Sequence, residues 1–378
     1  MILTRLHATL SAWLTQSAYP LWARCGIDAQ SGGFFEALAQ NGRGLDAPRR
    51  ARVHPRQMYA FAQARRFGWR GDASDIIRRG LEYFTACYRR DDGLFRTLVD
   101  SNGAPLDERA LLYDQAFALL GYAAAADTLI AAAAFERRAL ALRSLIERRF
   151  AAEDGGFRSS EVADGERQSN PHMHLLEACI AWSDIGADPS WARWVDDLVQ
   201  LALSRMIRPD TGALGESYTS SWQSAPGVAG RVVEPGHQYE WAWLLLRADE
   251  SNLRLRHAAL RLIEAGERGV HNRVAVNSLL DDFTVHDANA RFWPQTERLK
   301  AALTAARVTG DQRYWSMARD AASSFLPYLA SRVPGLWLDV QKPDGEILDS
   351  PAPASTFYHI VSAISALDDA LAVESRVD

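Results

Sequence analysis

Six stretches of the sequence bring imidazole, guanidinium and carboxylate groups to the starts of segments that are otherwise apolar. Histidines combined with an arginine and a glutamate, with no nucleophile beside them, suit removal of a proton next to a carbonyl group. An arginine and the N–H groups of helix ends can then hold the developing oxyanion. The candidate residues are Arg52 and His54, Tyr113 and Asp114, Asn170 and His174, His237 and Glu240, Trp293 and Glu297, and Tyr358 and His359.

The stretch from Glu234 to Leu246 shows the pattern most clearly. Pro235 suits the first turn of a helix, and the residues from Trp241 onward are apolar on nearly every face, as in a buried helix. His237 and Glu240 lie three residues apart and therefore share one face of that first turn. Such a pair either orders a core or does chemistry, and its recurrence along the chain favours chemistry.

Several of these residues have an alternative structural interpretation. Arg52 could cap a neighbouring carboxylate, His54 could serve either purpose, and Trp293 could belong to the core. His172 and His174 are two residues apart, so on a helix they face different directions. We expect His174 to reach the site and His172 to pack behind it.

The sequence carries no motif for a bound metal, nucleotide or covalent intermediate. It has no HExxH metal motif, no Walker or Rossmann glycine motif, no GxSxG, and no Cys-x-x-Cys. The histidines that could bind a metal are dispersed over three predicted helices, which suits acid–base chemistry equally well. We therefore predict neither a metal nor a cofactor.

Six units of roughly sixty residues, each the size of two helices with their loops, organise the chain. Turns that pair glycine with a large apolar residue mark them at Gly33, Gly93, Gly155, Gly212 and Gly335, with a degenerate copy near Gly269. Within the units, amphipathic helices expected to begin near Leu3, Asp72, Ala131, Pro189, Ser251 and Asp311 alternate with apolar ones. The apolar helices are expected to begin near His54, Arg109, Pro171, Pro235, Trp293 and Ser355.

This alternation predicts an all-α fold, an (α/α)6 barrel whose inner ring of buried helices is sheathed by an outer ring. The whole chain, residues 1–378, forms one domain in this interpretation, with short β-hairpins on the loops. The starts of the inner helices meet at one mouth, so the candidate residues converge there. We expect the long loop Ser220–Gly230 to be a rim or lid segment.

Composition excludes several classes of protein. The net charge of −5 gives no electrostatic footprint for nucleic acid or an anionic membrane, and no apolar stretch is long enough to span a bilayer. Three dispersed cysteines and the lack of a signal peptide predict a cytoplasmic protein. We expect it to be a monomer or a homodimer.

The motifs resemble those of the N-acylglucosamine 2-epimerase family, which includes mannose isomerases and cellobiose 2-epimerases. The similar segments are Arg52-Val-His54, Asn170-Pro-His-Met-His174, Pro235-Gly-His237-Gln-Tyr-Glu240, Phe292-Trp-Pro-Gln-Thr-Glu297 and Tyr358-His359. The resemblance implies metal-independent chemistry on a reducing sugar through a cis-enediolate. It implies His237 and His359 as the acid/base pair, His174 as a third catalytic histidine and Arg52 as the ligand of the carbonyl oxygen. It also implies that Asn170, Glu240, Trp293 and Glu297 contact substrate or orient histidines.

The segment Phe292–Lys300 is most similar to the mannose isomerase branch, so we expect interconversion of D-mannose and D-fructose. A free sugar is favoured because no dedicated cluster of lysines and arginines is evident. A 2-epimerase acting on N-acylglucosamine, mannose or cellobiose is the alternative. An (α/α)6 glycoside hydrolase, which would need two carboxylates facing across the cleft, and a non-catalytic sugar-binding protein are the other possibilities.

Overall fold

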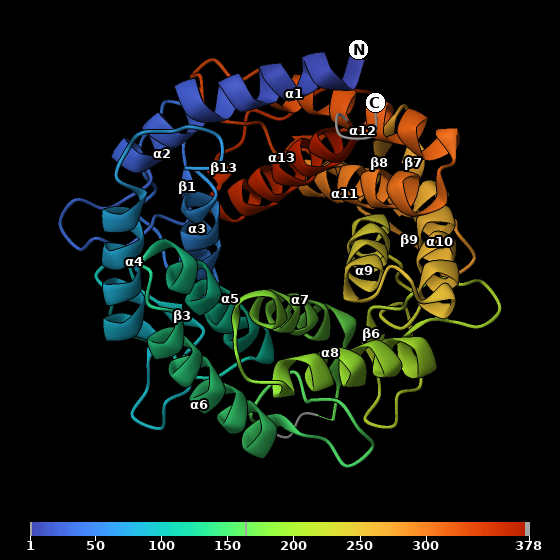
Figure 1. Cartoon of the computed structure of the whole chain (residues 1–378), viewed down its shortest axis with the longest axis horizontal. Coiled ribbons are helices and arrows are strands. Elements are labelled where there is room, and N and C mark those ends of the chain that lie inside the picture. The colour runs from blue at the N-terminus through green and yellow to red at the C-terminus, as the bar shows by residue number, and fades with distance from the viewer. Residues whose placement is uncertain (1, 163–164, 375–378) are drawn as a thin grey trace.

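The computed structural model describes residues 2–162 and 165–374, and within them the helices form two concentric rings (Figure 1). The inner ring consists of α3 (Val53–Ala62), α5 (Leu112–Thr128), α7 (Ser169–Ile185), α9 (Pro235–Ala248), α11 (Phe292–Thr309) and α13 (Ala354–Glu374). The outer ring consists of α1 (Ile2–Trp13), continued by a π-helical turn (Leu14–Ala18) and α2 (Tyr19–Cys25), then α4 (Ala73–Tyr88), α6 (Ala132–Phe150), α8 (Ser190–Leu201), α10 (Leu253–Glu267) and α12 (Gln312–Tyr328). Each inner helix packs on the next, and α13 packs back on α3. The fold is the predicted (α/α)6 barrel.

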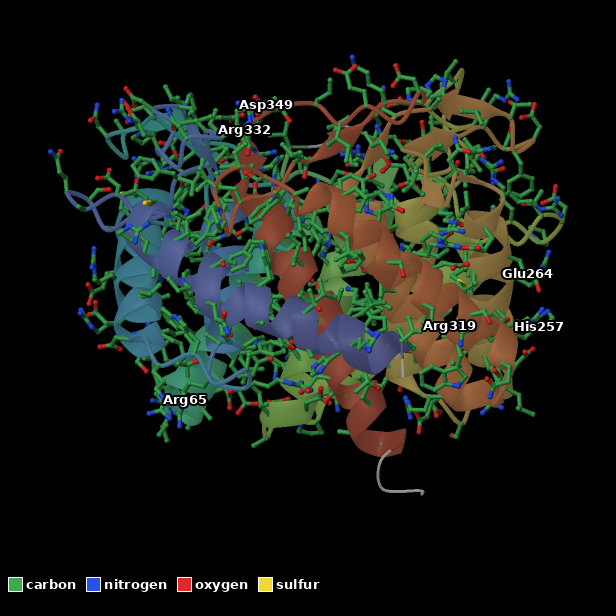
Figure 2. All side chains as sticks on the ribbon, turned by 90° about the horizontal axis from the view of Figure 1, so that it is seen from above. Arg65, His257, Glu264, Arg319, Arg332 and Asp349 are labelled. Carbon is green, nitrogen blue, oxygen red and sulfur yellow. The ribbon has the colours of Figure 1, made fainter. Side chains whose placement is uncertain are left out.

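The two rings differ in burial as their sequences predict. Inner helices are buried along nearly their whole length, whereas the outer helices bury one face and expose the other. On α10, for example, Leu255 and Leu262 are buried, while His257 and Glu264 project from the outer wall (Figure 2). Every predicted helix start lies within about three residues of the observed one. No helix in the described part of the chain is long and apolar enough to cross a membrane.

Short antiparallel strands connect neighbouring units, which differs from the expected local hairpins. Hairpins do occur within units, in the pairs β3 (Leu98–Val99) with β4 (Pro105–Asp107), β7 (Val270–His271) with β8 (Val274–Ala275), and β9 (Ser278–Leu279) with β10 (Val285–Asp287). The other pairs join consecutive units: β2 (Arg49–Arg50) with β3, β5 (Arg167–Gln168) with β6 (Ser217–Tyr218), and β11 (Ala290–Arg291) with β12 (Val340–Gln341). The pair β1 (Ala37–Leu38) and β13 (Ala352–Pro353) joins the last unit to the first and closes the ring.

A polar side chain near the start of an inner helix fixes the glycine-containing turn of its own unit. Gln115 accepts a hydrogen bond from the backbone N–H of Phe95 at 2.9 Å and donates to its carbonyl at 2.8 Å. Gln238 and Gln295 bind Leu214 and Ala275 in the same way. The Nε2 atoms of His54 and His172 each accept a hydrogen bond from the corresponding N–H, that of Phe34 at 3.1 Å and that of Phe157 at 2.9 Å. We call these five side chains the turn anchors.

His54 therefore stabilises a turn, and the prediction that it binds substrate is wrong. It is fully buried and its ring stacks on Tyr83 with ring centroids 4.9 Å apart. Burial, followed by the nearby Arg49 guanidinium, lowers the pKa of His54 to about 3, so the ring is neutral and can accept the N–H of Phe34.

We expect His54→Gln to retain activity and stability, because glutamine is the anchor in three other units. His54→Leu leaves the buried N–H of Phe34 without an acceptor and should cost about 1–3 kcal/mol. Chemical denaturation monitored by circular dichroism measures the difference between the two variants. Equal stability of both variants would show that this hydrogen bond contributes nothing.

Candidate active site

The turn anchors give a common register for the inner helices. Two residues beyond the anchor, the five helices α3, α5, α7, α9 and α11 carry Arg56, Phe117, His174, Glu240 and Glu297. In α13 the anchor position is taken by Phe357, which stacks on Trp337 of its own unit, and the residue two positions further is His359. The side chains at this level belong to one ring around the barrel axis, and most of them carry a titratable group.

A cavity of about 440 Å³ opens at the N-terminal ends of the inner helices. That volume lies within the range of small-molecule sites. Eight of the predicted site residues line it: Arg52, Tyr113, Asn170, His174, His237, Glu240, Trp293 and His359. Three do not, because Asp114 and Glu297 lie behind Arg52 and His359, and His54 is a turn anchor.

His237 lies between two carboxylates. Its Nδ1 is 2.8 Å from Oε2 of Glu216 and 3.8 Å from Oε2 of Glu234. Burial opposes the charged form, but the carboxylates of Glu216 and Glu234 outweigh it and raise the pKa of His237 to about 10. At neutral pH His237 is an imidazolium and can act as an acid.

His359 has the opposite character. Its Nδ1 lies 2.8 Å from Oε1 of Glu297, and its exposed fraction is 6%. Burial, reinforced by the positive charges of Arg56 and Lys300, lowers the pKa of His359 well below its usual value. Because the carboxylate accepts the Nδ1 proton, Nε2 of the neutral ring is the basic nitrogen. Two titratable groups whose pKa values are driven apart are an acid and a base.

Trp293 lies between these two histidines. Its ring centroid is 5.2 Å from that of His237 and 5.5 Å from that of His359. One face of a bound ring-shaped substrate could pack on this indole while both imidazoles reach it.

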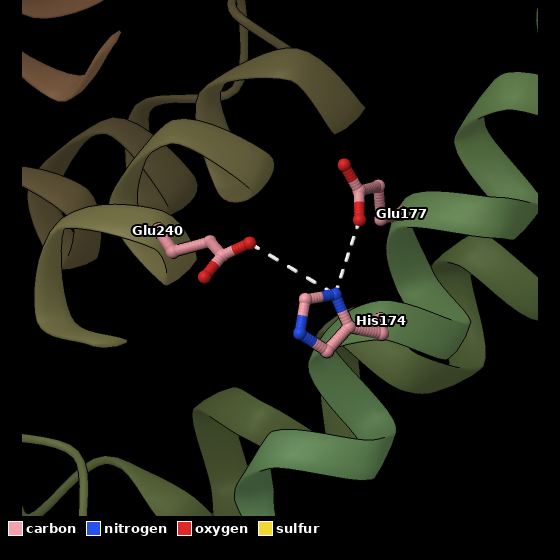
Figure 3. Close-up of side chains that lie close together, drawn as sticks. All are labelled: His174, Glu177 and Glu240. Atoms are coloured by element: carbon pink, nitrogen blue, oxygen red, sulfur yellow. Dashed lines mark hydrogen bonds and ion pairs between the residues drawn. The ribbon is translucent and has the colours of Figure 1, made fainter. Parts of the chain in front are cut away.

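His174 occupies the third corner of the cavity (Figure 3). Its Nδ1 is 3.1 Å from Oε2 of Glu177 and 3.9 Å from Oε1 of Glu240. Burial lowers the pKa of His174 to about 3, so this ring is neutral. Glu177 also binds the hydroxyl of Tyr358. Burial opposes its ionisation, but the hydrogen bond with His174 and the charge of Lys300 lower the pKa of Glu177 to about 2.

Two polar groups on the cavity wall have no hydrogen-bond partner within the described part of the protein. Both carboxyl oxygens of Glu240 and the Oδ1 of Asn170 are buried without a hydrogen bond. Burial and the nearby carboxylates of Glu297 and Glu177 raise the pKa of Glu240 well above its usual value. Buried polar atoms are costly to leave unpaired, so these groups are suited to bind the hydroxyls of a ligand.

Two arginines on α3 and its N-terminal boundary differ in their partners. Arg52 forms an ion pair with buried Asp114, with Nη1 and Oδ1 3.1 Å apart. Arg56 is 6% exposed and lines the same cavity, yet it makes no ion pair with any described residue. Its Nη2 donates to the Tyr113 hydroxyl at 2.7 Å, and its guanidinium lies over the Phe117 ring at 4.2 Å. Arg56 therefore offers the cavity a positive charge that no carboxylate neutralises.

Sequence reasoning missed Arg56 and the role of Glu216. Arg56 was not selected as a candidate because Arg52, one turn earlier, matched the family motif. Its register, two residues after an anchor, is the signal that could have identified it. Glu216 lies in a loop about twenty residues before His237, and its pairing with that histidine depends on the tertiary fold.

The loop 220–230 is anchored away from the cavity, contrary to the expectation of a lid. Its Trp222 is buried, donates from Nε1 to the carbonyl of Gly155, and packs edge-on against His172. None of its residues lines the cavity.

The histidines and carboxylates are close enough to form metal-binding groups. Within the described residues the three sets lie around His174, His237 and His359, each with two carboxylates. In every set a carboxylate already faces the Nδ1 of its histidine. In this arrangement Glu177, Glu216 and Glu297 each orient a histidine.

Comparison with known proteins gives one consistent result. A family model described as N-acylglucosamine 2-epimerase (GlcNAc 2-epimerase) matches residues 33–363. A curated relative from Rhizobium meliloti (strain 1021), named mannose-6-phosphate isomerase, is 43% identical over 373 residues and covers 96% of each chain. A protein of Thermobifida fusca named D-mannose isomerase is 30% identical and covers 70% of each chain.

Solved structures share the fold. A cellobiose 2-epimerase from Spirochaeta thermophila superimposes with a TM-score of 0.88 at 21% identity, covering 100% of this chain and 98% of the other. A D-mannose isomerase superimposes with a TM-score of 0.85 at 22% identity, covering 97% of each chain. The extent of the family match and the identity to curated relatives show that this chain belongs to the N-acylglucosamine 2-epimerase family and is an isomerase or epimerase of sugars.

Proposed function

We propose that the protein interconverts D-mannose and D-fructose, moving a proton between C2 and C1 of the open-chain sugar. The observation that carries this proposal is one cavity lined by His359, whose pKa is lowered, by His237, whose pKa is raised, and by Arg56, which forms no ion pair with a described residue. The names of the curated relatives support mannose as the sugar.

In the proposed reaction, Nε2 of His359 takes the proton from C2, and the electron pair of the C–H bond forms the enediolate. Negative charge develops on the former carbonyl oxygen, where Arg56 and the free N–H groups of the inner helix ends can stabilise it. His237 holds a proton that it can share with a sugar oxygen. Return of the proton from His359 to C1, donation of a proton from His237 to O1, and transfer of the O2 hydroxyl proton back to His237 yield the ketose and restore the enzyme.

The same residues could serve epimerisation at C2. Delivery of a proton by His237 to the opposite face of C2 would give the epimer. The relatives named as mannose isomerases favour the first outcome.

The test is to incubate the protein with free mannose, glucose, N-acetylglucosamine, cellobiose and fructose in deuterated water and to follow products by NMR. We expect fructose from mannose, and mannose from fructose, with undiminished rates after treatment with a chelator. A C2 epimer carrying deuterium would replace the isomerase by the 2-epimerase, and loss of activity with the chelator would contradict the metal-independent mechanism.

The same isomerisation of mannose 6-phosphate is the second candidate. The name of the Rhizobium meliloti relative suggests it. Several arginines line the cavity, whereas the sequence had suggested no cationic cluster. Arg50 and Arg291 line the cavity beside Arg52 and Arg56, with their side chains 42% and 39% exposed. Guanidinium groups bind phosphate well. A kcat/KM at least about ten-fold higher for the phosphate ester than for mannose, lost in Arg50→Gln or Arg291→Gln, would establish this candidate.

We further propose that the protein is cytoplasmic. The cysteines at 25, 87 and 179 are free thiols, which supports a reducing, cytoplasmic environment. For the assembly we keep the prediction of a monomer or homodimer.

A further inference from the structure

Below the catalytic level, the inner helices carry a buried lysine that the proposed mechanism does not use. Lysine is rare in this chain: Lys300 and Lys342 are the only two, whereas arginine supplies the other cationic side chains. Lys342 is on the surface, where it pairs with Glu346. Lys300, on α11, is completely buried. Lysine is among the residues least often found in that position, unless it is paired.

The Lys300 ammonium has two direct contacts. Its Nζ is 2.6 Å from Oε2 of Glu297 and lies 3.7 Å from the centroid of the Trp243 ring. The other oxygen of Glu297, Oε1, faces Nδ1 of His359 at 2.8 Å. One carboxylate thus joins a permanent cation to the histidine that lines the cavity.

The surroundings contain an excess of buried carboxyl groups. Glu177, Glu240 and Glu297 are all at most 3% exposed, and Lys300 interacts electrostatically with all three. The charged and titratable side chains that face this region come from the adjacent inner helices: Arg56 and Tyr59 from α3, His174 and Glu177 from α7, His237, Glu240 and Arg247 from α9, and Tyr358 and His359 from α13. Three buried carboxylates without a cation would be strongly destabilised, so at least one would take up a proton.

We propose that Lys300 is a positioning residue for His359: its ammonium keeps Glu297 ionised, and the Glu297 carboxylate in turn holds the proton of His359 on Nδ1 and leaves Nε2 free to accept the substrate proton. This inference rests on the proposed role of His359 as the base. If Glu297 were protonated, its hydroxyl would donate to Nδ1, the ring proton would move to Nε2, and the basic nitrogen would face away from the cavity.

The influences on Glu297 agree with this role. The pKa of Glu297 lies above its usual value because burial raises it; the charge and hydrogen bond of Lys300 limit this rise, Glu177 adds to it, and His174 opposes it. Removal of Lys300 leaves mainly the influences that favour the protonated form.

The test compares Lys300→Met with Lys342→Met, the only other lysine-to-methionine change that the chain allows. At pH 7 we expect kcat of Lys300→Met to fall about 10–100-fold with little change in KM, by analogy with the loss of an outer partner of a metal-binding histidine. As the pH rises and Glu297 ionises, kcat should recover towards the wild-type value. Lys342→Met should stay within about two-fold of wild type at every pH, as expected for a surface pair.

A loss of kcat that does not recover with pH would overturn the proposal and indicate a packing role only. The position of the imidazole proton gives a readout independent of activity: in 15N NMR spectra, the His359 signals, assigned by their absence in His359→Gln, should report Nδ1–H in wild type and Nε2–H in Lys300→Met. Should the wild type convert no sugar, the proposed function fails while this NMR result still decides the role of Lys300.

If Lys300→Met does not fold, the charge of the Lys300 side chain itself still tests the proposal. In a Lys342→Met background with 13C-labelled lysine, Lys300 gives the only lysine signal. We expect its ammonium to remain charged through the alkaline range in which an ordinary lysine is charged, because burial lowers its pKa but Glu297, Glu240 and Glu177 raise it above the ordinary value. A Lys300 amine that is neutral near pH 8 would contradict the proposal.

Discussion

His359→Gln is expected to reduce kcat by about 10³-fold or more, with little change in KM or thermal stability. General bases contribute roughly 10²–10⁴-fold, and the glutamine amide cannot accept a proton from carbon. Glutamine can still donate from its amide to Oε1 of Glu297, which His359 binds in the native protein, so the surroundings need not rearrange. Steady-state isomerisation of mannose, and exchange of the C2 proton with solvent measured by NMR, report the loss.

His257→Gln is the matched control, since His257 is exposed on α10 on the outer wall. Its activity should be indistinguishable from wild type. Retention of C2 exchange in His359→Gln, with loss of ketose formation alone, would contradict the assignment of His359 as the base and move that role to His174 or His237.

Arg56→Met is expected to lower kcat by about 10²–10³-fold, the scale observed when one donor to a developing oxyanion is removed. The physical reason is that Arg56 is the cationic group in the cavity that has no carboxylate partner among the described residues. The charge of Arg52, by contrast, is already balanced by Asp114. The measurement is kcat and KM for mannose and fructose with both variants.

Arg52→Met is the comparison, and its main effect should be on stability. The substitution leaves the fully buried carboxyl group of Asp114 without its ion-pair partner. Removing one partner of a buried ion pair typically costs about 3–5 kcal/mol of stability. If Arg52→Met loses at least as much kcat as Arg56→Met while remaining folded, the oxygen ligand is Arg52, as the sequence resemblance implies.

The architecture was accessible from the sequence because it repeats. Burial on all faces separates α9 and α5 from amphipathic helices such as α4, and the glycine turns divide the chain at near-constant intervals. Local patterns of this kind can be recognised without knowledge of tertiary contacts. The strand pairs between units, such as β1 with β13, left no such signal, because two-residue strands are too short to show a periodicity.

The site was accessible only in part. His174, His237 and His359 could be placed at one mouth because each follows the start of an apolar helix. What the sequence could not supply is which partner each side chain meets: Glu216 for His237 and Lys300 for Glu297 depend on tertiary packing. The sequence also could not show that His54 is a turn anchor, since a histidine at a helix start can anchor a turn as readily as it can face a ligand.

The closure of the ring between its first and last units has a consequence for biosynthesis. The seam joins β1 to β13 and α3 to α13, and α13 carries His359. As the ribosome releases the chain, the segment bearing the proposed base emerges after all the other cavity residues. A nascent chain lacking only α13 would form an incomplete ring of helices, and its cavity would lack the side contributed by α13. Catalytic activity should therefore appear only when α13 docks. Circular permutants cut elsewhere in the outer loops would change which helix completes that step without changing the finished site.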